Sequence, residues 1–200
     1  KGGCGKSTIA THLASWFARF DDIVYLGDLD RQQSSKQWLD LRPEHLPGIR
    51  LWDLCGHEEI GSPPDDADFA IIDTPAGLHG KPLRKMLNTV DRIVVPVLPS
   101  RFDMLASRDF FEELGEIKAV RKEKVGVAIV AMRVDQRTHS TQNLIEFLQQ
   151  FDLPLVTCIR NTQRYVQVID SGMSLLDSSA SDCADLAQWR PLLDWLVSRR

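Results

Sequence analysis

The feature that most restricts the fold of this 200-residue chain is its opening segment, KGGCGKST. A glycine-rich turn, a lysine and two hydroxyl residues stand directly before a helical pattern, as in loops that hold nucleotide phosphates at the start of a helix. Gly2, Gly3 and Gly5 permit positive φ angles, so that consecutive backbone N–H groups can point toward phosphate oxygens. Such a loop needs a strand to lead into it, and we therefore expect the natural chain to begin roughly ten residues before Lys1.

Each position of this segment has an expected role toward a nucleoside triphosphate. Lys6 would bridge the β and γ phosphates, Ser7 would place its hydroxyl on Mg²⁺, and Thr8 would contact the α phosphate. Cys4 would contribute its backbone, and we interpret its side chain as a tolerated small group. The positions expected to bind the nucleotide are therefore Gly2, Gly3, Cys4, Gly5, Lys6, Ser7 and Thr8.

Short apolar runs alternate with longer stretches of helical periodicity along the rest of the chain. The apolar runs predict buried strands at residues 23–28, 69–73, 92–98, 125–132 and 155–159, with a short strand at 49–54 inside a proline-rich surface segment, 42–68. Helices are expected at residues 7–20, 81–90, 103–121, 140–151 and 182–198. This alternation predicts a single α/β domain over residues 1–200, with a doubly wound, mainly parallel sheet flanked by helices.

Two of the predicted strands end in carboxylates, at the edge where ligands of open α/β sheets bind. Asp28 and Asp30 close the strand at 23–28, and Asp73 closes the strand at 69–73 before the turn TPAG. Carboxylate oxygens suit Mg²⁺ and can orient a water for attack on a phosphate. The alternative is that Asp28 or Asp30 only caps the helix that follows.

The order of the opening residues, with a lysine directly before paired glycines, resembles the deviant Walker A motif of the ParA/MinD family of dimeric ATPases. The likeness implies the P-loop NTPase fold and a catalytic role for Lys1 at the partner subunit's ATP, in the manner of an arginine finger. Lys1 as a solvated surface residue is the alternative. The segment DLDRQ is similar to the family's DxDPQ, with Arg31 in place of proline. By that likeness Asp30 positions the attacking water, Asp28 supports Mg²⁺ through its shell, and Asp73 is the Walker B carboxylate.

The resemblance continues through RIVVPVLPS at 92–100 and TCIRNTQRYVQVIDSGMSL at 157–175, and it is closest to the small ParA-type partition ATPases. It implies an ATP- and Mg²⁺-dependent homodimer that binds DNA without sequence preference and uses hydrolysis to partition or position a plasmid, a chromosome or a protein cargo. It further implies a ParB-like partner or cargo adaptor that stimulates hydrolysis, a cytoplasmic and nucleoid-associated location, and Arg133 as the adenine contact.

Non-specific DNA binding requires cations gathered on one face. A net charge of −4 argues against a protein that coats nucleic acid by bulk charge, so a local basic patch is needed. Arg160 and Arg164 are the preferred pair. Like this pair, Arg133 and Arg137 lie at or after the ends of late strands. Five further candidates are scattered over helical and loop positions: Arg84, Lys85, Arg121, Lys122 and Lys124. Each candidate has the alternative of a solvated surface charge.

Three other classes of protein are alternatives to a DNA-binding partition ATPase. A membrane-cycling ATPase of the MinD type would use the apolar face of the last predicted helix, but Asp182, Asp185 and Asp194 oppose anionic lipid, and such a helix commonly packs on its own sheet. A nucleotide-switched scaffold with little hydrolysis is favoured only by Arg31. Iron–sulfur carriers with this loop need clustered cysteines, whereas the four cysteines here lie far apart.

Overall fold

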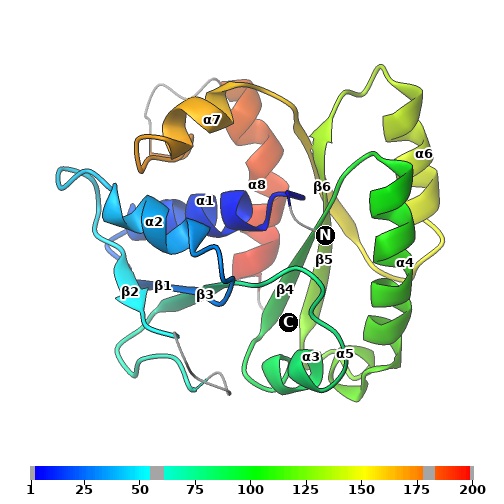
Figure 1. Ribbon diagram of the computed structural model, residues 1–200, viewed down its shortest axis with the longest axis horizontal. Helices are drawn as coiled ribbons and strands as arrows, with labels where there is room; N and C mark the ends of the chain where they lie inside the picture. The colour runs from blue at the N-terminus through cyan, green and yellow to red at the C-terminus, as the bar shows by residue number, and fades with distance from the viewer. Residues whose placement is uncertain (1–2, 55–60, 178–182, 199–200) are drawn as a thin grey trace. The chain divides into compact units, whose positions relative to one another are not determined.

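A computed structural model of the chain describes residues 3–54, 61–177 and 183–198. The chain divides into two compact units. The β1 unit comprises Lys6–Leu78 and Thr162–Leu186, and the β4 unit comprises His79–Asn161 and Ala187–Arg200 together with the first five residues. Each unit holds one three-stranded parallel sheet, and Figure 1 labels the strands and helices of both.

The sheet of the β1 unit has the strand order β2-β1-β3, in which β1 (Val24–Asp28) lies between β2 (Arg50–Trp52) and β3 (Phe69–Asp73). The register pairs Asp28 with Asp73, so the two strands end side by side. Helix α1 (Lys6–Ala18) contacts β1 and β3, and α2 (Ser34–Asp40) contacts β1 and α1. The short α7 (Arg164–Ile169) and the first four residues of α8 (Cys183–Val197) also belong to this unit.

Apolar packing between α1 and the sheet forms the core of the β1 unit. Ile9, Leu13 and Phe17 of α1 are buried, and the Phe17 ring stacks on Phe69 with 3.8 Å between the ring centroids. Gly27 permits the close approach of Leu54, because a Cβ at Gly27 would lie 2.5 Å from Leu54 Cδ1. Burial of this kind is the dominant favourable contribution to folding.

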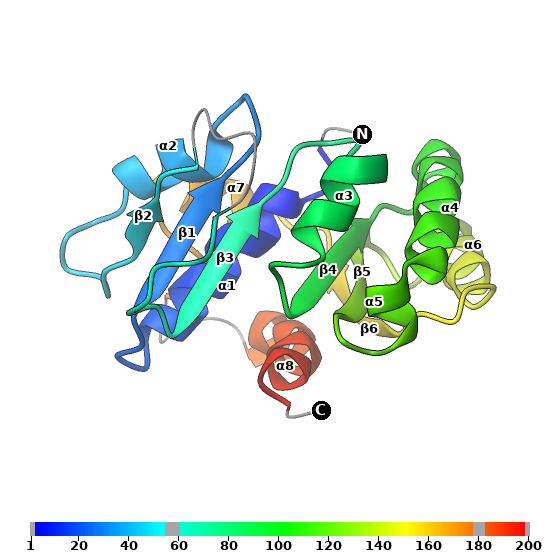
Figure 2. The ribbon, with the colours of Figure 1, turned by 90° about the horizontal axis from the view of Figure 1, so that it is seen from below.

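The sheet of the β4 unit has the order β4-β5-β6, with β5 (Gly126–Val134) between β4 (Arg92–Val97) and β6 (Leu155–Arg160). β5 is almost entirely buried, as its apolar run predicts. Helices α4 (Arg101–Glu116) and α6 (His139–Leu148) lie side by side in Figures 1 and 2. The other helices are α3 (Gly80–Met86), α5 (Lys118–Arg121) and the part of α8 (Cys183–Val197) that begins at Ala187.

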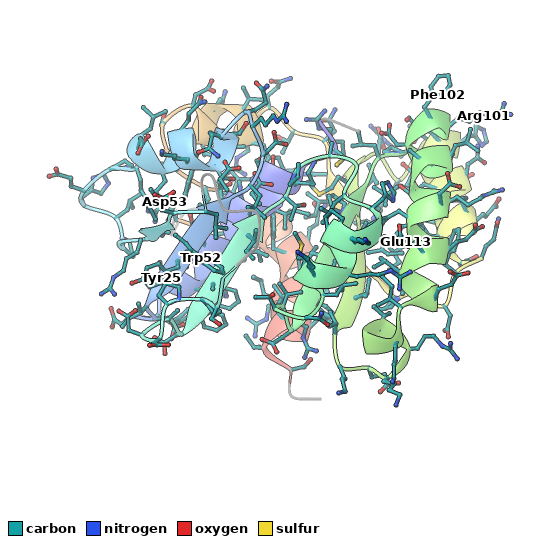
Figure 3. The ribbon with its side chains drawn as sticks, turned by 60° about the horizontal axis from the view of Figure 1, so that its bottom comes forward. Tyr25, Trp52, Asp53, Arg101, Phe102 and Glu113 are labelled. Carbon is teal, nitrogen blue, oxygen red and sulfur yellow. The ribbon has the colours of Figure 1, made fainter. Side chains whose placement is uncertain are left out.

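Side-chain hydrogen bonds cap the starts of two helices in the β4 unit. One comes from the helix's own N-cap residue and the other from a different helix. The Ser100 Oγ accepts the backbone N–H of Asp103 at 3.2 Å and so caps α4. Glu113 lies on α4 on the side that faces α3 (Figure 3), and its Oε1 accepts the backbone N–H of Gly80 at 2.9 Å. The N-cap residue of α3, His79, forms no side-chain cap of its own, so Glu113 supplies that contact.

The predicted parallel α/β fold is confirmed, and the predicted strands match the observed ones to within about two residues at most ends. The helix expected at 103–121 is wrong as a single element. It divides into α4 and α5 because Ile117 adopts an extended conformation and buries its side chain. The helix expected at 81–90 ends at Met86, and α2 was given no predicted range, although the capping alternative for Asp28 and Asp30 assumed a helix after them. No helix in the described parts of the chain is long and apolar enough to span a membrane.

Candidate functional site

Gly3 and Gly5 adopt backbone conformations that a phosphate loop can use. Gly3 has φ of +83° and Gly5 has φ of +104°, a region that favours glycine. A Cβ at Gly5 would also lie 3.0 Å from Met132 Cε, so a larger residue there would be both strained and crowded. Cys4 is not in a disulfide. Lys1 and Gly2 lie outside the described residues, and their roles stay predictions.

Lys6, Ser7 and Thr8 open α1, where the first backbone N–H groups have no partner within the helix. The carbonyls of Ser7 and Thr8 accept bonds from the Thr11 hydroxyl at 2.8 Å and 3.2 Å. The first turn therefore has backbone N–H groups without a partner in the helix and carries a lysine, while the Thr11 hydroxyl bonds the carbonyls of Ser7 and Thr8. This arrangement suits an anion at the helix start.

His12 holds the same turn from inside the β1 unit. Its Nδ1 donates to the Thr8 carbonyl at 2.8 Å, and its Nε2 accepts the backbone N–H of Leu175 at 3.2 Å. These two partners require the neutral ring with the proton on Nδ1. Complete burial lowers the pKa of His12 to about 4, in spite of the opposing effects of the Thr8 carbonyl and Asp177. His12 thus stays neutral at physiological pH and fixes the start of α1.

Asp28 is buried at the end of β1, and both of its carboxylate oxygens accept backbone hydrogen bonds. Oδ1 accepts the N–H of Asp30 at 2.9 Å, and Oδ2 accepts the N–H groups of Ser35 at 2.8 Å and Lys36 at 3.2 Å. The N-cap residue of α2, Gln33, has a left-handed conformation and makes no side-chain cap. Asp28 therefore caps α2 from the neighbouring strand, and its predicted place in the magnesium shell stays a prediction.

Asp30 lies in the turn between β1 and α2 and is partly exposed. Its Oδ1 accepts the N–H of Gln32 at 3.0 Å, and its carbonyl accepts from Gln33. The carboxylate is thus oriented by its own turn at the carboxyl end of the sheet. That position is compatible with orienting a water, although no described contact of Asp30 reaches a phosphate-loop residue.

Asp73 differs from Asp28 and Asp30, because one of its carboxylate oxygens is buried without a hydrogen-bond partner. Oδ2 accepts the Ser35 hydroxyl at 2.8 Å, whereas Oδ1 has no partner among the described residues. Burial, the largest influence, raises the pKa of Asp73, and the charge of Asp28 raises it further. The Ser7 and Ser35 hydroxyls and the Lys6 ammonium act in the opposite direction. The structure therefore brings Ser7, Lys6 and Asp73 together.

This neighbourhood fits a magnesium ion that is shared with a nucleotide. An unsatisfied buried carboxylate oxygen is energetically unfavourable unless a cation or water meets it. Ser7 and Asp73 supply the oxygen ligands that Mg²⁺ prefers. The described residues contain no group of three or more His, Cys, Asp or Glu placed to hold a metal by themselves. An ion here would consequently depend on phosphate and water oxygens for the remaining ligands, as Mg²⁺ usually does.

The β4 unit contains a cavity of about 620 Å³ at the carboxyl ends of β5 and β6. Arg133, Arg137 and Arg160 line it, together with Pro99 and Gln188. Arg133 has φ of +53° at a break in the β5–β6 pairing, a conformation that non-glycine residues rarely adopt outside functional or tightly held sites. Arg137 is engaged by Asp135, and this contact lowers the pKa of Asp135 to about 2.

The two preferred DNA-binding arginines have other contacts in the structure. Arg164 donates to the carboxylate of Asp185 at 2.6 Å, and the Asp185 side chain is only 1% exposed. Replacing Arg164 would remove this ion pair from a buried carboxylate, which is unfavourable. Arg160 lines the cavity, and its backbone N–H donates to Gln188 Oε1 at 2.9 Å. Their contact with DNA stays a prediction, and Arg164 has a structural role besides.

Two residues of this site were not predicted from the sequence. Ser35 orients Asp73, and its only sequence signal is a hydroxyl residue a few positions after the DLDRQ segment. His12, one of five histidines in the chain, has no sequence signal that singles it out. Its helical spacing of four from Thr8 allows the observed bond, but its second partner, Leu175, is too distant in sequence to be found without the fold.

Comparison with known proteins identifies the family of this chain and one curated relative. The model of the family described as "CobQ/CobB/MinD/ParA nucleotide binding domain" matches residues 1–176. Maintenance of carboxysome distribution protein A of Halothiobacillus neapolitanus is 27% identical over 187 residues, which cover 90% of this chain and 85% of that protein.

Solved structures share the fold at low identity. A plasmid partition protein of Borrelia burgdorferi bound to AMPPNP has a TM-score of 0.72 at 17% identity and covers 98% of this chain and 95% of its own. The McdA–ATP complex of Cyanothece has a TM-score of 0.69 at 15% identity, covering 96% and 93%. Because the family model matches residues 1–176, this chain belongs to the CobQ/CobB/MinD/ParA nucleotide binding domain family.

Proposed function

We propose that this chain is an ATPase that binds ATP with Mg²⁺, forms a homodimer in the ATP state, and uses hydrolysis to partition or position a cargo on non-specifically bound DNA. The observation that carries the proposal is the buried, unpartnered Oδ1 of Asp73 beside Ser7 and Lys6. Family membership and the ATP, AMPPNP or ADP-magnesium complexes of similar structures support the same ligands.

In this mechanism the protein's residues bind and orient the phosphate groups of the nucleotide and keep other charged groups away from them. The glycine loop and the start of α1 hold the phosphates, and Lys6 neutralises charge on the β and γ groups. Ser7 and Asp73 would hold Mg²⁺, which supplies charge neutralisation at the transferring phosphate. Asp30 orients a water whose oxygen bonds to the γ phosphorus as the bond to the β-phosphate oxygen breaks, and the proton of that water ends on the released phosphate. Lys1 would add a positive charge to the partner subunit's site.

Among the possible cargoes, a protein assembly has the best support. The curated relative, 27% identical over most of both chains, is named for the maintenance of carboxysome distribution. A plasmid or a chromosome is the alternative cargo, and a ParB-like protein or cargo adaptor would stimulate turnover in either case. The proposed ATPase would act in the cytoplasm in association with the nucleoid.

A membrane-cycling role of the MinD type is less well supported by α8. Trp189, Leu192 and Leu193, which form half of its apolar face, are buried in the protein at 0–2% exposure. They are therefore not available as a lipid anchor in this conformation.

The direct experiment measures phosphate release and sedimentation with ATP and with ADP, in the presence of duplex DNA. The wild type is expected to dimerise and to bind DNA with ATP but not with ADP. Lys6→Ala should abolish nucleotide binding, whereas Asp30→Ala should yield an ATP-bound dimer that does not turn over. Normal hydrolysis by Asp30→Ala would contradict the role of Asp30. Background hydrolysis in the presence of both DNA and the cognate partner would favour a nucleotide-switched scaffold instead.

A further inference from the structure

Cations are concentrated at one segment of the β4 unit. Lys118, Arg121, Lys122 and Lys124 stand within the seven residues 118–124, where Glu123 is the single acid, so the segment has a net charge of +3 in a chain of net charge −4. All four side chains are exposed. With the other described residues none of the four forms a side-chain hydrogen bond or ion pair.

The fold places two more cations at the same end of the sheet. β4 and β5 begin side by side, since Arg92 pairs with Gly126 and the Gly126 N–H donates to the Asp91 carbonyl at 2.9 Å. Helix α3, whose last turn carries exposed Arg84 and Lys85, leads into β4, and the 118–124 segment leads into β5. Figure 1 shows α3 and α5 at this end of the sheet. We call the six cations Arg84, Lys85, Lys118, Arg121, Lys122 and Lys124 the basic edge.

Favourable interaction with helix dipoles accounts for part of this charge and not for the rest. Arg84 and Lys85 lie in the last turn of α3 and Arg121 ends α5, where cations are stabilised, whereas Lys118 is the first residue of α5. Lys122 is the C-cap residue of α5, and Lys124 lies beyond that cap and gains little from the helix. Like charges so close together repel one another, and an anionic partner would relieve that repulsion.

We propose that the basic edge binds the phosphate backbone of duplex DNA. This inference rests on the DNA binding in the proposed function and names its surface. No large apolar side chain is exposed among the described side chains of residues 80–92 and 117–126, so the edge lacks the apolar groups that insert into a membrane. It also lacks exposed aromatic rings for stacking on bases. Phosphate contacts without base contacts give binding that does not depend on sequence.

The basic edge is separate from the cavity of the β4 unit. Gly126 and Arg133 lie seven residues apart along β5, which corresponds to about 23 Å in a strand. DNA on the basic edge would therefore leave the cavity around Arg133 accessible. If the basic edge is the DNA-binding surface, Arg164 is not needed as a DNA contact. Its guanidinium is engaged by Asp185.

The test compares two variants of equal net charge in the full chain with ATP and Mg²⁺. The first is Arg121→Gln/Lys122→Gln/Lys124→Gln. The control is Arg101→Gln/Arg108→Gln/Arg190→Gln, which removes three exposed cations elsewhere. Figure 3 shows Arg101 projecting outward at the start of α4. Binding to a random-sequence duplex is measured over a series of salt concentrations, alongside ATP affinity and thermal stability.

The basic-edge variant is expected to bind DNA roughly 100-fold more weakly, with the slope of log affinity against log salt reduced by about 2.7, because about 0.9 of slope is lost for each phosphate contact. ATP affinity and stability should match the wild type. Equal losses in the two variants would overturn the basic edge while leaving ATP-dependent DNA binding intact. A wild type that binds anionic vesicles and not DNA would overturn both the inference and the DNA-binding part of the proposed function.

Discussion

Asp28 and Asp73 end neighbouring strands in matched register, and they are 4% and 1% exposed, yet their surroundings differ. Asp28 accepts three backbone N–H groups, two of them from the start of α2. Asp73 accepts one hydroxyl and has a buried oxygen without a partner. Two identical residues at equivalent positions thus differ in their contacts: the oxygens of Asp28 are occupied by backbone N–H groups, whereas Asp73 has one oxygen available to a cation.

The largest expected effect follows from removing the charge of Asp73. Asp73→Asn should reduce ATP hydrolysis by roughly 1,000-fold, equivalent to about 4 kcal/mol, because the metal loses its protein carboxylate. The free energy of unfolding without ligand should be unchanged or higher, since a buried charge is removed. Steady-state phosphate release and urea denaturation measure the two quantities. A strongly destabilised Asp73→Asn protein would show that Asp73, too, is structural.

Replacement of Asp28 should affect the fold first. Asp28→Ala leaves three backbone N–H groups without an acceptor, and the free energy of unfolding should fall by about 3 kcal/mol. Asp28→Asn retains one acceptor oxygen and should lose roughly half as much. Urea denaturation of both variants gives the comparison. A loss of hydrolysis with full stability in Asp28→Asn would instead place Asp28 in the magnesium shell.

The pH dependence of stability should differ between the wild type and Asp73→Asn. Because the folded state raises the pKa of Asp73, it binds a proton more tightly than the unfolded chain does. Stability contributed by this group is therefore present below its unfolded pKa of 3.8 and is lost as the pH rises through the folded pKa. Without nucleotide, the wild type should lose more stability than Asp73→Asn as the pH rises through this range. The difference between the two unfolding curves isolates Asp73 from His12, which also titrates in acid. Parallel curves would contradict the burial argument.

The smallest effect is expected from Ser35. Ser35→Ala removes the hydroxyl that orients Asp73, at about 1 kcal/mol of stability, and leaves the backbone N–H of residue 35 on Asp28. The magnesium concentration needed for half-maximal hydrolysis should rise a few-fold while the maximal rate changes little. Metal titration of the hydrolysis rate tests this. An unaltered metal requirement would mean that Asp73 is held by its burial alone.

The sequence was sufficient for the elements whose signal is local. The apolar runs located the strands, and the opening segment with Asp28, Asp30 and Asp73 located the candidate site. It did not distinguish Asp28 from Asp73, because the cap on α2 joins residues on different elements and Gln33 carries no capping signal. The pairing of Arg164 with Asp185 and the gathering of Lys124 with Lys85 also depend on the fold. Sequence spacing made those cations look scattered.

The difference between the two carboxylates is tested most directly by calorimetric titration of ATP at increasing Mg²⁺ in the wild type, Asp28→Asn and Asp73→Asn. The affinity of the wild type and of folded Asp28→Asn should rise with Mg²⁺, whereas that of Asp73→Asn should stay nearly constant. An Asp73→Asn protein whose ATP affinity responds to Mg²⁺ as the wild type does would contradict the assignment of the metal to Asp73.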